Sequence, residues 1–265
     1  MPTGYTITRL STTPVKGLRI HHPDSIHLTP QGARGDRLFY LVDDEGGVQS
    51  CTRNPGLYAL SAAYDEETRR LEVSRGGEVL HGGVVEAADT VDTDMWGLRM
   101  LAGDVVADPT WGSLFSEVVG RGVRLVRARG SAFDVHPVTL LGGASLARLT
   151  RHAGLAQIDP RRFRMLLEFT GGDPHVEDSW AGELLHAGGA VLRAGGPVHR
   201  CAATTRDPDR GAVDLQTLRL ITGYRGRQES ALGLGANFGV YAEVVEPGTV
   251  SLGDRLKLGT ERPPP

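Results

Sequence analysis

The residues best suited to chemistry in this chain surround Cys201, one of only two cysteines among 265 residues. His199 and Arg200 precede it, and Arg206 follows it. Cationic neighbours favour the thiolate, which is the nucleophilic and metal-binding form of a cysteine. A short apolar stretch precedes Cys201, and the run at 207–211, Asp-Pro-Asp-Arg-Gly, has turn composition. The sequence therefore predicts a reactive thiol near a strand end, with a buried, unreactive cysteine as the alternative.

Common catalytic and binding motifs are absent from the sequence. Gly-Gly pairs are frequent, but none belongs to a GxGxxG fingerprint, and there is no Walker A motif. The nine histidines include no HExxH, no Cys/His cluster has zinc spacing, and no GxSxG elbow occurs. This elimination leaves Cys201 and its arginines as the main candidate. Lys16 also stands out, because it and Lys257 are the only lysines among 29 basic residues.

Composition narrows the class of protein. Apolar content of 40% and charged content of 23% are typical of globular domains. A net charge of −3 gives no reason to expect nucleic acid or an anionic membrane as a partner. No apolar run is long enough to span a bilayer, and the N-terminus lacks a signal-peptide pattern. Two cysteines without framework spacing argue against a disulfide-stapled secreted protein, so we expect a cytoplasmic one.

The pattern of elements predicts a mainly β (α+β) fold. Short strands separated by glycine-rich turns favour barrels or sandwiches over a parallel βαβ sheet. Helices are expected from about residue 109 and over 145–154, and 215–225 is ambiguous between helix and strand. The remaining signals indicate strands, and the expected ranges in the first half are 1–10, 25–28, 38–42, 57–63, 70–74, 78–80 and 98–101. A further strand is expected at 123–126, and two around a Pro-Gly turn close the chain.

Several segments, taken in order, resemble MOSC-domain proteins. PVHRCAATTRDPDRG resembles the family signature P-x-x-R-C…T-x-D-P-x-x-G. HPVTLLGGASLARL, RFRMLLEF, HVEDSWAGELLHAGG and NFGVYAEVVEPGTVSLGD resemble further segments of the same domain. TPVKGLRI, GARGDRLFYLVD and SCTRNPGLYALS resemble the MOSC N-terminal β-barrel domain. The resemblance runs from about residue 5 to 258 and implies two β-barrel-like domains, at 1–124 and 125–258, with a disordered tail at 259–265.

This two-domain group includes the amidoxime-reducing component and its bacterial relatives, and the resemblance implies a molybdenum cofactor (Mo-molybdopterin). Cys201 matches the protein thiolate that binds the metal, and a soft thiolate suits a sulfur-rich molybdenum centre. A pterin phosphate needs cations and hydrogen-bond donors. The resemblance offers seven cofactor-binding candidates, namely Lys16, Arg37, Ser145, Arg164, Arg200, Thr204 and Thr205. Taken singly, each of these residues has an ordinary structural explanation, such as a surface ion pair.

The implied function is the reduction of N-oxygenated (N-hydroxylated) small molecules, with His199 as a candidate proton donor near the metal. No cysteine run for a [2Fe–2S] domain follows Cys201, so electrons are expected from an external donor protein. Two departures fall near the site: Met165-Leu166 replace the family's Pro-Asn, and His199 replaces a small polar residue. The alternatives are a sulfur carrier with a Cys201 persulfide and a non-catalytic cofactor carrier.

Overall fold

The second half of the chain, together with β1 (Tyr5–Leu10) from the first half, forms a closed seven-stranded barrel. The computed structural model describes residues 4–259, so all of the predicted tail except Gly259 lies outside the described residues. The barrel strands follow one another in the order β1-β12-β11-β15-β14-β13-β17. In chain order they are β1 (Tyr5–Leu10), β11 (Val138–Gly142), β12 (Leu167–Thr170), β13 (Leu184–Ala187), β14 (Ala190–His199), β15 (Asn237–Glu246) and β17 (Arg255–Leu258).

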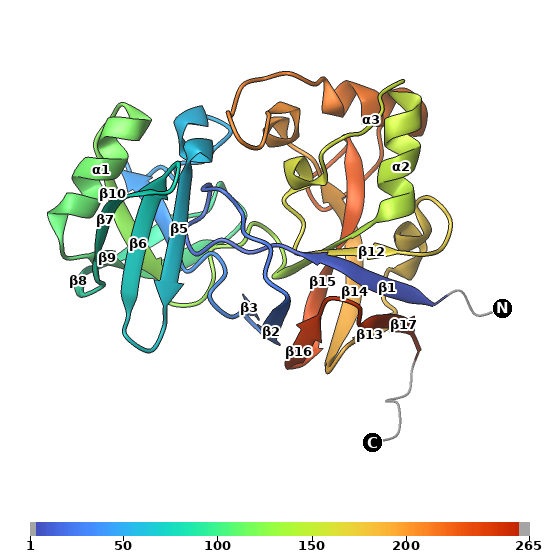
Figure 1. Ribbon diagram of the computed structural model, residues 1–265, viewed down its shortest axis with the longest axis horizontal. Coiled ribbons are helices and arrows are strands. Elements are labelled where there is room, and N and C mark those ends of the chain that lie inside the picture. Colours follow the sequence, from blue (N-terminus) through green and yellow to red (C-terminus); the bar gives the residue numbers. More distant parts are fainter. Residues whose placement is uncertain (1–3, 260–265) are drawn as a thin grey trace.

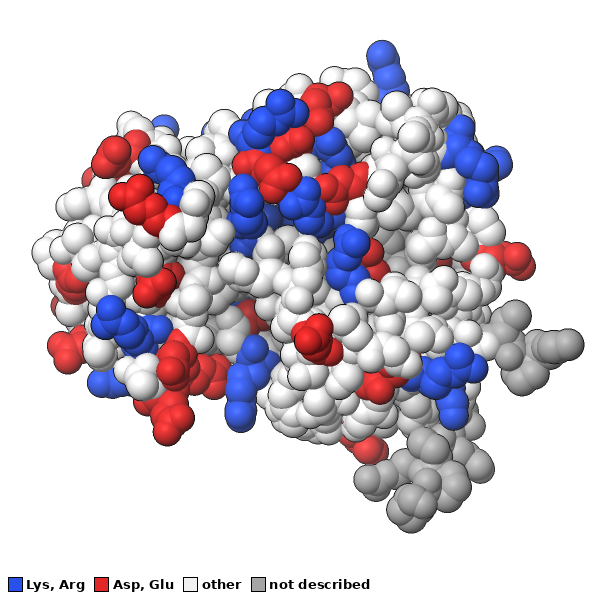
Figure 2. Space-filling model, viewed as in Figure 1, with Lys and Arg blue, Asp and Glu red and all other residues white. Residues whose placement is uncertain are grey.

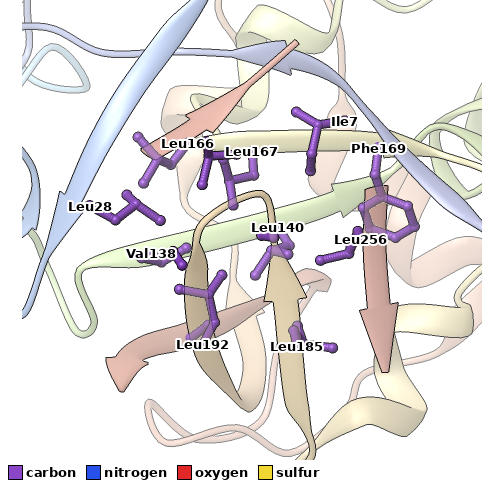
Figure 3. Close-up of a cluster of buried hydrophobic side chains, with 14 of the residues drawn as sticks. Ile7, Leu28, Val138, Leu140, Leu166, Leu167, Phe169, Leu185, Leu192 and Leu256 are labelled. Carbon is purple, nitrogen blue, oxygen red and sulfur yellow. The ribbon is translucent and has the colours of Figure 1, made fainter. Parts of the chain in front are cut away.

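The barrel is filled by apolar side chains that alternate along its strands. Figure 3 shows Ile7, Leu140, Leu167, Leu185 and Leu256 converging on this interior from different strands. Phe169 adds an edge-on contact with Tyr5 at 5.5 Å between ring centroids. Burial of this continuous cluster is the main favourable term that holds the barrel closed, since apolar stabilisation scales with the area removed from water.

The first half forms two small sheets around a second core. A four-stranded sheet has the order β4-β10-β9-β8, and a three-stranded sheet has the order β5-β6-β7 (Figure 1, left). The strands are β4 (Phe39–Asp43), β5 (Leu60–Asp65), β6 (Arg70–Arg75), β7 (Glu78–Val84), β8 (Ala87–Asp94), β9 (Met100–Val106) and β10 (Val123–Ala128). The expected mainly β class is confirmed, and β8, which sequence analysis did not predict, pairs with β9.

Helix α1 (Pro109–Val119) packs against the four-stranded sheet. Asp108 accepts a hydrogen bond from the Thr110 backbone N–H at 2.9 Å, and Pro109 occupies the first turn. The helix ends at Gly120, whose positive φ of 78° is one that glycine adopts without strain. Its buried face presents Trp111 and Phe115 to the core of this half. The predicted start near residue 109 is therefore confirmed.

The remaining helices lie beside the barrel. Helix α2 (Gly143–His152) follows β11, and the ambiguous stretch at 215–225 is helical as α3 (Thr217–Arg225). The described residues also form four short 3-10 helices: η1 (Pro55–Ala59), η2 (Pro160–Phe163), η3 (Val176–Trp180) and η4 (Ala202–Thr205). The helices α2 and α3 pack on one another at the top right of Figure 1.

The two halves share strands across the predicted division at 124/125. That boundary falls inside β10, which pairs with β4 and β9 of the first half. In the other direction, β1 belongs to the barrel through β12 and β17. A third sheet, β16-β2-β3, pairs β2 (Ser25–Thr29) with β16 (Gly248–Ser251) and β3 (Gly32–Ala33). The two halves are therefore interlocked, because β1 of the first half is a strand of the barrel and β16 of the second half pairs with β2.

Charged side chains of both signs are interspersed on the face in Figure 2, with their densest gathering near the junction of the two halves. Ion pairs join the two halves, and in one of them Arg19 lies 3.4 Å from Asp209. Arg161 also binds Asp209, at 2.8 Å. Within residues 4–259, no helix has the length and apolar character needed to cross a membrane.

Glu168 on β12 makes the barrel's stability depend on pH. Burial raises its pKa to about 7, although Arg9 at 3.7 Å opposes the shift. Between pH about 4.5 and about 7, Glu168 is protonated in the folded state and ionised in the unfolded state. The free energy of unfolding of wild type should therefore fall as pH rises through this window. Glu168→Gln should remove up to about 3 kcal/mol of that fall. Urea unfolding at pH 5 and pH 8 measures it, and parallel pH dependences for both proteins would contradict the assignment.

Candidate functional site

A cavity of about 510 Å³ lies between the two halves and gathers six of the predicted site residues. Lys16 and Arg37 reach it from the loops of the first half, and Arg164 from the loop after η2. His199, Arg200 and Cys201 reach it from the end of β14. Residues separated by up to 185 positions therefore line one space, as expected if the halves form one site.

Cys201 lies at the point where β14 gives way to the short helix η4, and it is exposed. Its backbone carbonyl accepts hydrogen bonds from the Thr204 hydroxyl at 3.0 Å and from the Thr204 N–H at 3.2 Å. The Thr205 hydroxyl donates to the Ala202 carbonyl at 2.7 Å. The two threonines therefore fix the turn that presents the thiol. The hydroxyl of Thr52, from the other half, lies 4.0 Å from the sulfur.

Lys16 is buried beside Asp134 at one wall of the cavity. Its Nζ donates to the Ala132 carbonyl at 2.7 Å and contacts the Asp134 carboxylate. Burial lowers the pKa of Lys16, and Asp134 counteracts part of that shift. The Asp134 side chain is 53% exposed, and its partial desolvation is outweighed by the charges of Lys16, Arg37 and Arg164, which lower its pKa. Because Asp36 also binds Arg37, these three cations face two carboxylates, which leaves a net positive wall.

Arg37 and Arg164 lock the two halves together at the cavity. The guanidinium of Arg37 binds Asp36 and donates to the Arg164 backbone carbonyl at 3.3 Å. In return, Arg164 donates to the Leu18 carbonyl at 2.7 Å. Both residues have positive φ, 50° and 52°, which is uncommon outside glycine. Such strain persists only where the surroundings hold it in place, and it concentrates at functional sites.

Arg200 is a buried cation without a carboxylate partner. Its guanidinium donates to the Phe163 carbonyl and to the Met165 sulfur, the latter at 3.2 Å. Its Nε is buried and makes no hydrogen bond, and none of the ion pairs formed by residues 4–259 includes this side chain. Burial lowers its pKa, and the neighbouring Cys201 opposes the shift. A buried charge left this way is costly unless an anion comes to it.

His199 is the last residue of β14 and faces the cavity from beneath the 228–235 loop. Its Nδ1 lies 3.2 Å from the Ser230 hydroxyl. Gly235 packs against the ring so closely that a Cβ there would lie 2.2 Å from His199 Cε1. The loop therefore holds the imidazole in place, and a side chain at 235 would displace it.

Three cofactor-binding candidates do not line the cavity. Ser145 on α2 is fully buried, donates to both Glu177 carboxylate oxygens at 2.7 and 2.9 Å, and accepts from the His175 N–H at 2.8 Å. Its hydroxyl is therefore committed to linking α2 and η3. Thr204 and Thr205 are also buried, with their hydroxyls bonded inside the turn. All three side chains therefore make hydrogen bonds within the protein, and their contact with a cofactor stays a prediction.

Sequence reasoning also missed several lining residues. Asp134, Trp96 and Tyr241 all face the cavity, and so does Cys51, which the sequence suggested was only a structural cysteine. Burial raises the pKa of Tyr241 to about 12. The sequence feature that could have pointed to Asp134 as a site residue is its position in the polar connection just before the HPVTLLGG segment. Met165 and Leu166, the two departures from the family pattern, also lie on the wall, and Met165 accepts the Arg200 bond.

With this geometry in place, comparison with known families defines the class of protein. Residues 4–121 match the MOSC N-terminal beta barrel domain, and residues 128–257 match the MOSC domain. The chain therefore belongs to the MOSC family, in its two-domain form. The cavity lies between these two matched segments, and each contributes residues to its wall.

Particular relatives are distant but span nearly the whole chain. Mitochondrial amidoxime-reducing component 1 of Homo sapiens is 25% identical over 282 residues, covering 96% of this chain and 82% of the relative. The Mus musculus protein of the same name is also 25% identical, with the same coverage. Among solved structures, the YUAD protein from Bacillus subtilis aligns with a TM-score of 0.47 at 13% identity, covering 98% of this chain and 97% of that one.

Proposed function

We propose that this protein is an oxidoreductase that uses a molybdenum cofactor to reduce N-hydroxylated compounds, with Cys201 as the protein ligand of the metal. MOSC membership supports a function related to this cofactor, and the relatives' name, amidoxime-reducing component, supports the reaction. The observation that carries the proposal is an exposed thiol beside a buried arginine that has no carboxylate partner.

The residues present fit such a cofactor. Within residues 4–259, no three His, Cys, Asp or Glu side chains gather as a metal site, so a metal at Cys201 takes its other ligands from the bound group. A dithiolene supplies soft sulfur ligands that match a thiolate. The pterin phosphate would be held by Lys16, Arg37, Arg164 and Arg200, whose charge only Asp36 and Asp134 offset nearby.

When bound, the cofactor supplies two-electron chemistry that removes oxygen from the substrate nitrogen. The chain's own residues have separate tasks. The cations would orient the cofactor, and the Cys201 thiolate would hold its metal. His199, held by Ser230, would donate a proton to the departing oxygen, because imidazoles exchange protons near neutral pH.

This proposal includes a cytoplasmic location and an external protein as electron donor. No nucleic acid and no membrane partner is invoked. The substrate is a small molecule, since Cys201 faces a cavity of about 510 Å³. We invoke no Fe–S cluster within this chain.

The proposal is tested on protein produced in a host that makes the cofactor. Purified protein should contain molybdenum and pterin near one per chain, and it should reduce an amidoxime to the amidine with reduced viologen as donor. Molybdenum is measured by elemental analysis and pterin by fluorescence after oxidation. Cofactor without turnover would favour a non-catalytic carrier. Protein that binds no molybdenum under these conditions would contradict the proposal.

One observation favours a second candidate, a sulfur carrier. Both cysteines, Cys51 and Cys201, are free and line the same cavity, so a persulfide on exposed Cys201 would lie near a second thiol. Sulfane sulfur on Cys201, found by mass spectrometry of molybdenum-free protein, would support this function. Its loss in Cys201→Ser but not in Cys51→Ser would assign the carrier residue.

A further inference from the structure

A tryptophan occupies the tip of the β8–β9 hairpin, directly over the positive wall of the cavity. Trp96 lines the cavity and is 40% exposed. Its ring lies 5.0 Å from Lys16 Nζ, so one side of the indole covers the lysine. Large aromatic side chains are usually buried or bound to something, and one held half-exposed at a cavity mouth indicates a contact surface.

The backbone at Trp96 is unfavourable for its own side chain. Trp96 and Gly97 both have positive φ, 57° and 74°, and the Leu98 N–H bonds to the Met95 carbonyl at 3.0 Å. Trp96 and Gly97 are thus the central residues of a turn in which both have positive φ, and Asn, Asp or Gly is preferred at the first of these positions. Tryptophan there is strained, so local structure does not explain its presence. Of the five described non-glycine residues with positive φ, Trp96, Arg37 and Arg164 line this cavity.

A second apolar residue faces the cavity from the other half. Leu232, in the 228–235 loop, also lines the cavity and is exposed. This loop is held by hydrogen bonds from Asn237 to the Gln228 and Glu229 carbonyls, at 3.1 and 2.9 Å. The same loop positions His199 through Ser230. Leu232 therefore lies in the same loop that positions the proposed proton donor, His199.

We propose that Trp96 and Leu232 form an apolar entrance that binds a planar, apolar substituent of the substrate and so determines specificity. The inference rests on the proposed function for the reacting group, but the apolar contact stands on the cavity itself. A small molecule is favoured over a docking protein because both residues line a concave space that continues to Cys201. The substrate class is then N-hydroxylated compounds with an aromatic or similarly flat apolar body.

Binding is measured on the holoenzyme by tryptophan fluorescence. The chain has three tryptophans, and Trp111 and Trp180 are buried in the cores of the two halves. Trp96 alone among them lines the cavity, so a change in emission reports ligand at the entrance. The probes are benzamidoxime and acetamidoxime without an electron donor, so neither turns over. Benzamidoxime should bind about 5- to 10-fold tighter, the range of one good aromatic contact, and its emission change should vanish in Trp96→Phe.

Activity with both amidoximes then separates recognition from folding. Trp96→Asn places a preferred residue in the turn, so its thermal midpoint should equal or exceed that of wild type. The same variant should raise KM for benzamidoxime about 5- to 10-fold and change KM for acetamidoxime less than about 2-fold. Trp96→Phe should retain most of the preference, and Leu232→Ala should lose part of it. Met100→Ala is the matched control, because Met100 is on the same hairpin, 65% exposed and outside the cavity lining.

Each outcome decides the inference. A lower midpoint in Trp96→Asn with an unchanged substrate preference would make Trp96 structural and overturn it. Unchanged KM for both amidoximes, with a raised KM for the protein electron donor, would make the entrance a protein-docking surface and also overturn it. If wild type binds benzamidoxime at Trp96 but reduces neither amidoxime, the apolar entrance stands and the proposed reaction fails.

Discussion

Replacing Cys201 by serine should lower turnover of an N-hydroxylated substrate to below about 1% of wild type. Loss of an outer-shell partner of a metal ligand already costs about 10- to 100-fold, and Cys201 is proposed as the ligand itself. Serine keeps the size and loses the soft thiolate, so the effect should come from the metal and not from packing. Cys201 is exposed, and its carbonyl rather than its sulfur holds the turn, so the fold should be retained.

Cys51→Ser is the matched control for this experiment. Cys51 lines the same cavity but is buried among the core residues of the first half. It should retain molybdenum and turnover, with a modest loss of stability from placing a hydroxyl in an apolar site. Molybdenum content and turnover are measured on both variants, alongside thermal unfolding. Full turnover in folded Cys201→Ser would remove Cys201 from the metal site.

The site residues that could be predicted from the sequence are those of a rare residue type. Cys201 stood out as a rare thiol among cations, and Lys16 as a rare lysine, and both face the cavity. Ser145 lies outside the cavity lining, and its hydroxyl binds Glu177, whose carboxylate is fully buried and has its pKa raised by burial. A buried acid without a cation needs such donors, and periodicity does not show which serine provides them.

The hairpin that carries Trp96 could not be predicted from the sequence pattern. Its strand β8, AADTVDTD, is polar and largely exposed, so it lacks the alternation that marks a half-buried strand. Its pairing with β9 and the Asp94 bond to the Gly97 N–H, at 2.7 Å, define it instead. Without β8, the sequence pattern does not predict the turn at 95–98, and it gives no reason to expect Trp96 at a cavity.

Long-range strand pairing, which the sequence pattern does not show, joins the two halves across the predicted boundary. The apolar alternation of β1 predicts a strand but does not say which sheet it joins. Its partners, β12 and β17, lie about 160 and 250 residues further along the chain. A consequence is that residues 125–258 lack one barrel strand when separated from the first half. The site and the barrel therefore both depend on the whole chain.

Replacing Arg200 by methionine should uncouple cofactor retention from stability. Arg200 is buried to 9% exposure with an unpaired Nε and no carboxylate partner, so the unloaded protein carries the cost of its charge. Methionine fills a similar volume without that charge. The free energy of unfolding of the unloaded variant should therefore change by less than about 1 kcal/mol, or rise. Its retained molybdenum and pterin should fall at least about 10-fold, since charge-assisted bonds to a phosphate are the strong ones.

Arg162→Met is the matched control, because Arg162 has the same 9% exposure and also lines the cavity. Unlike Arg200, it holds Asp214 with two hydrogen bonds of 2.7 Å, so its removal leaves an unpaired carboxylate. This variant should lose about 1–3 kcal/mol of stability and should keep cofactor in whatever fraction remains folded. Urea unfolding of unloaded protein and cofactor content of purified protein distinguish the two. Equal destabilisation by both substitutions would show that the Arg200 charge is structural, and the proposed phosphate contact would lose its basis.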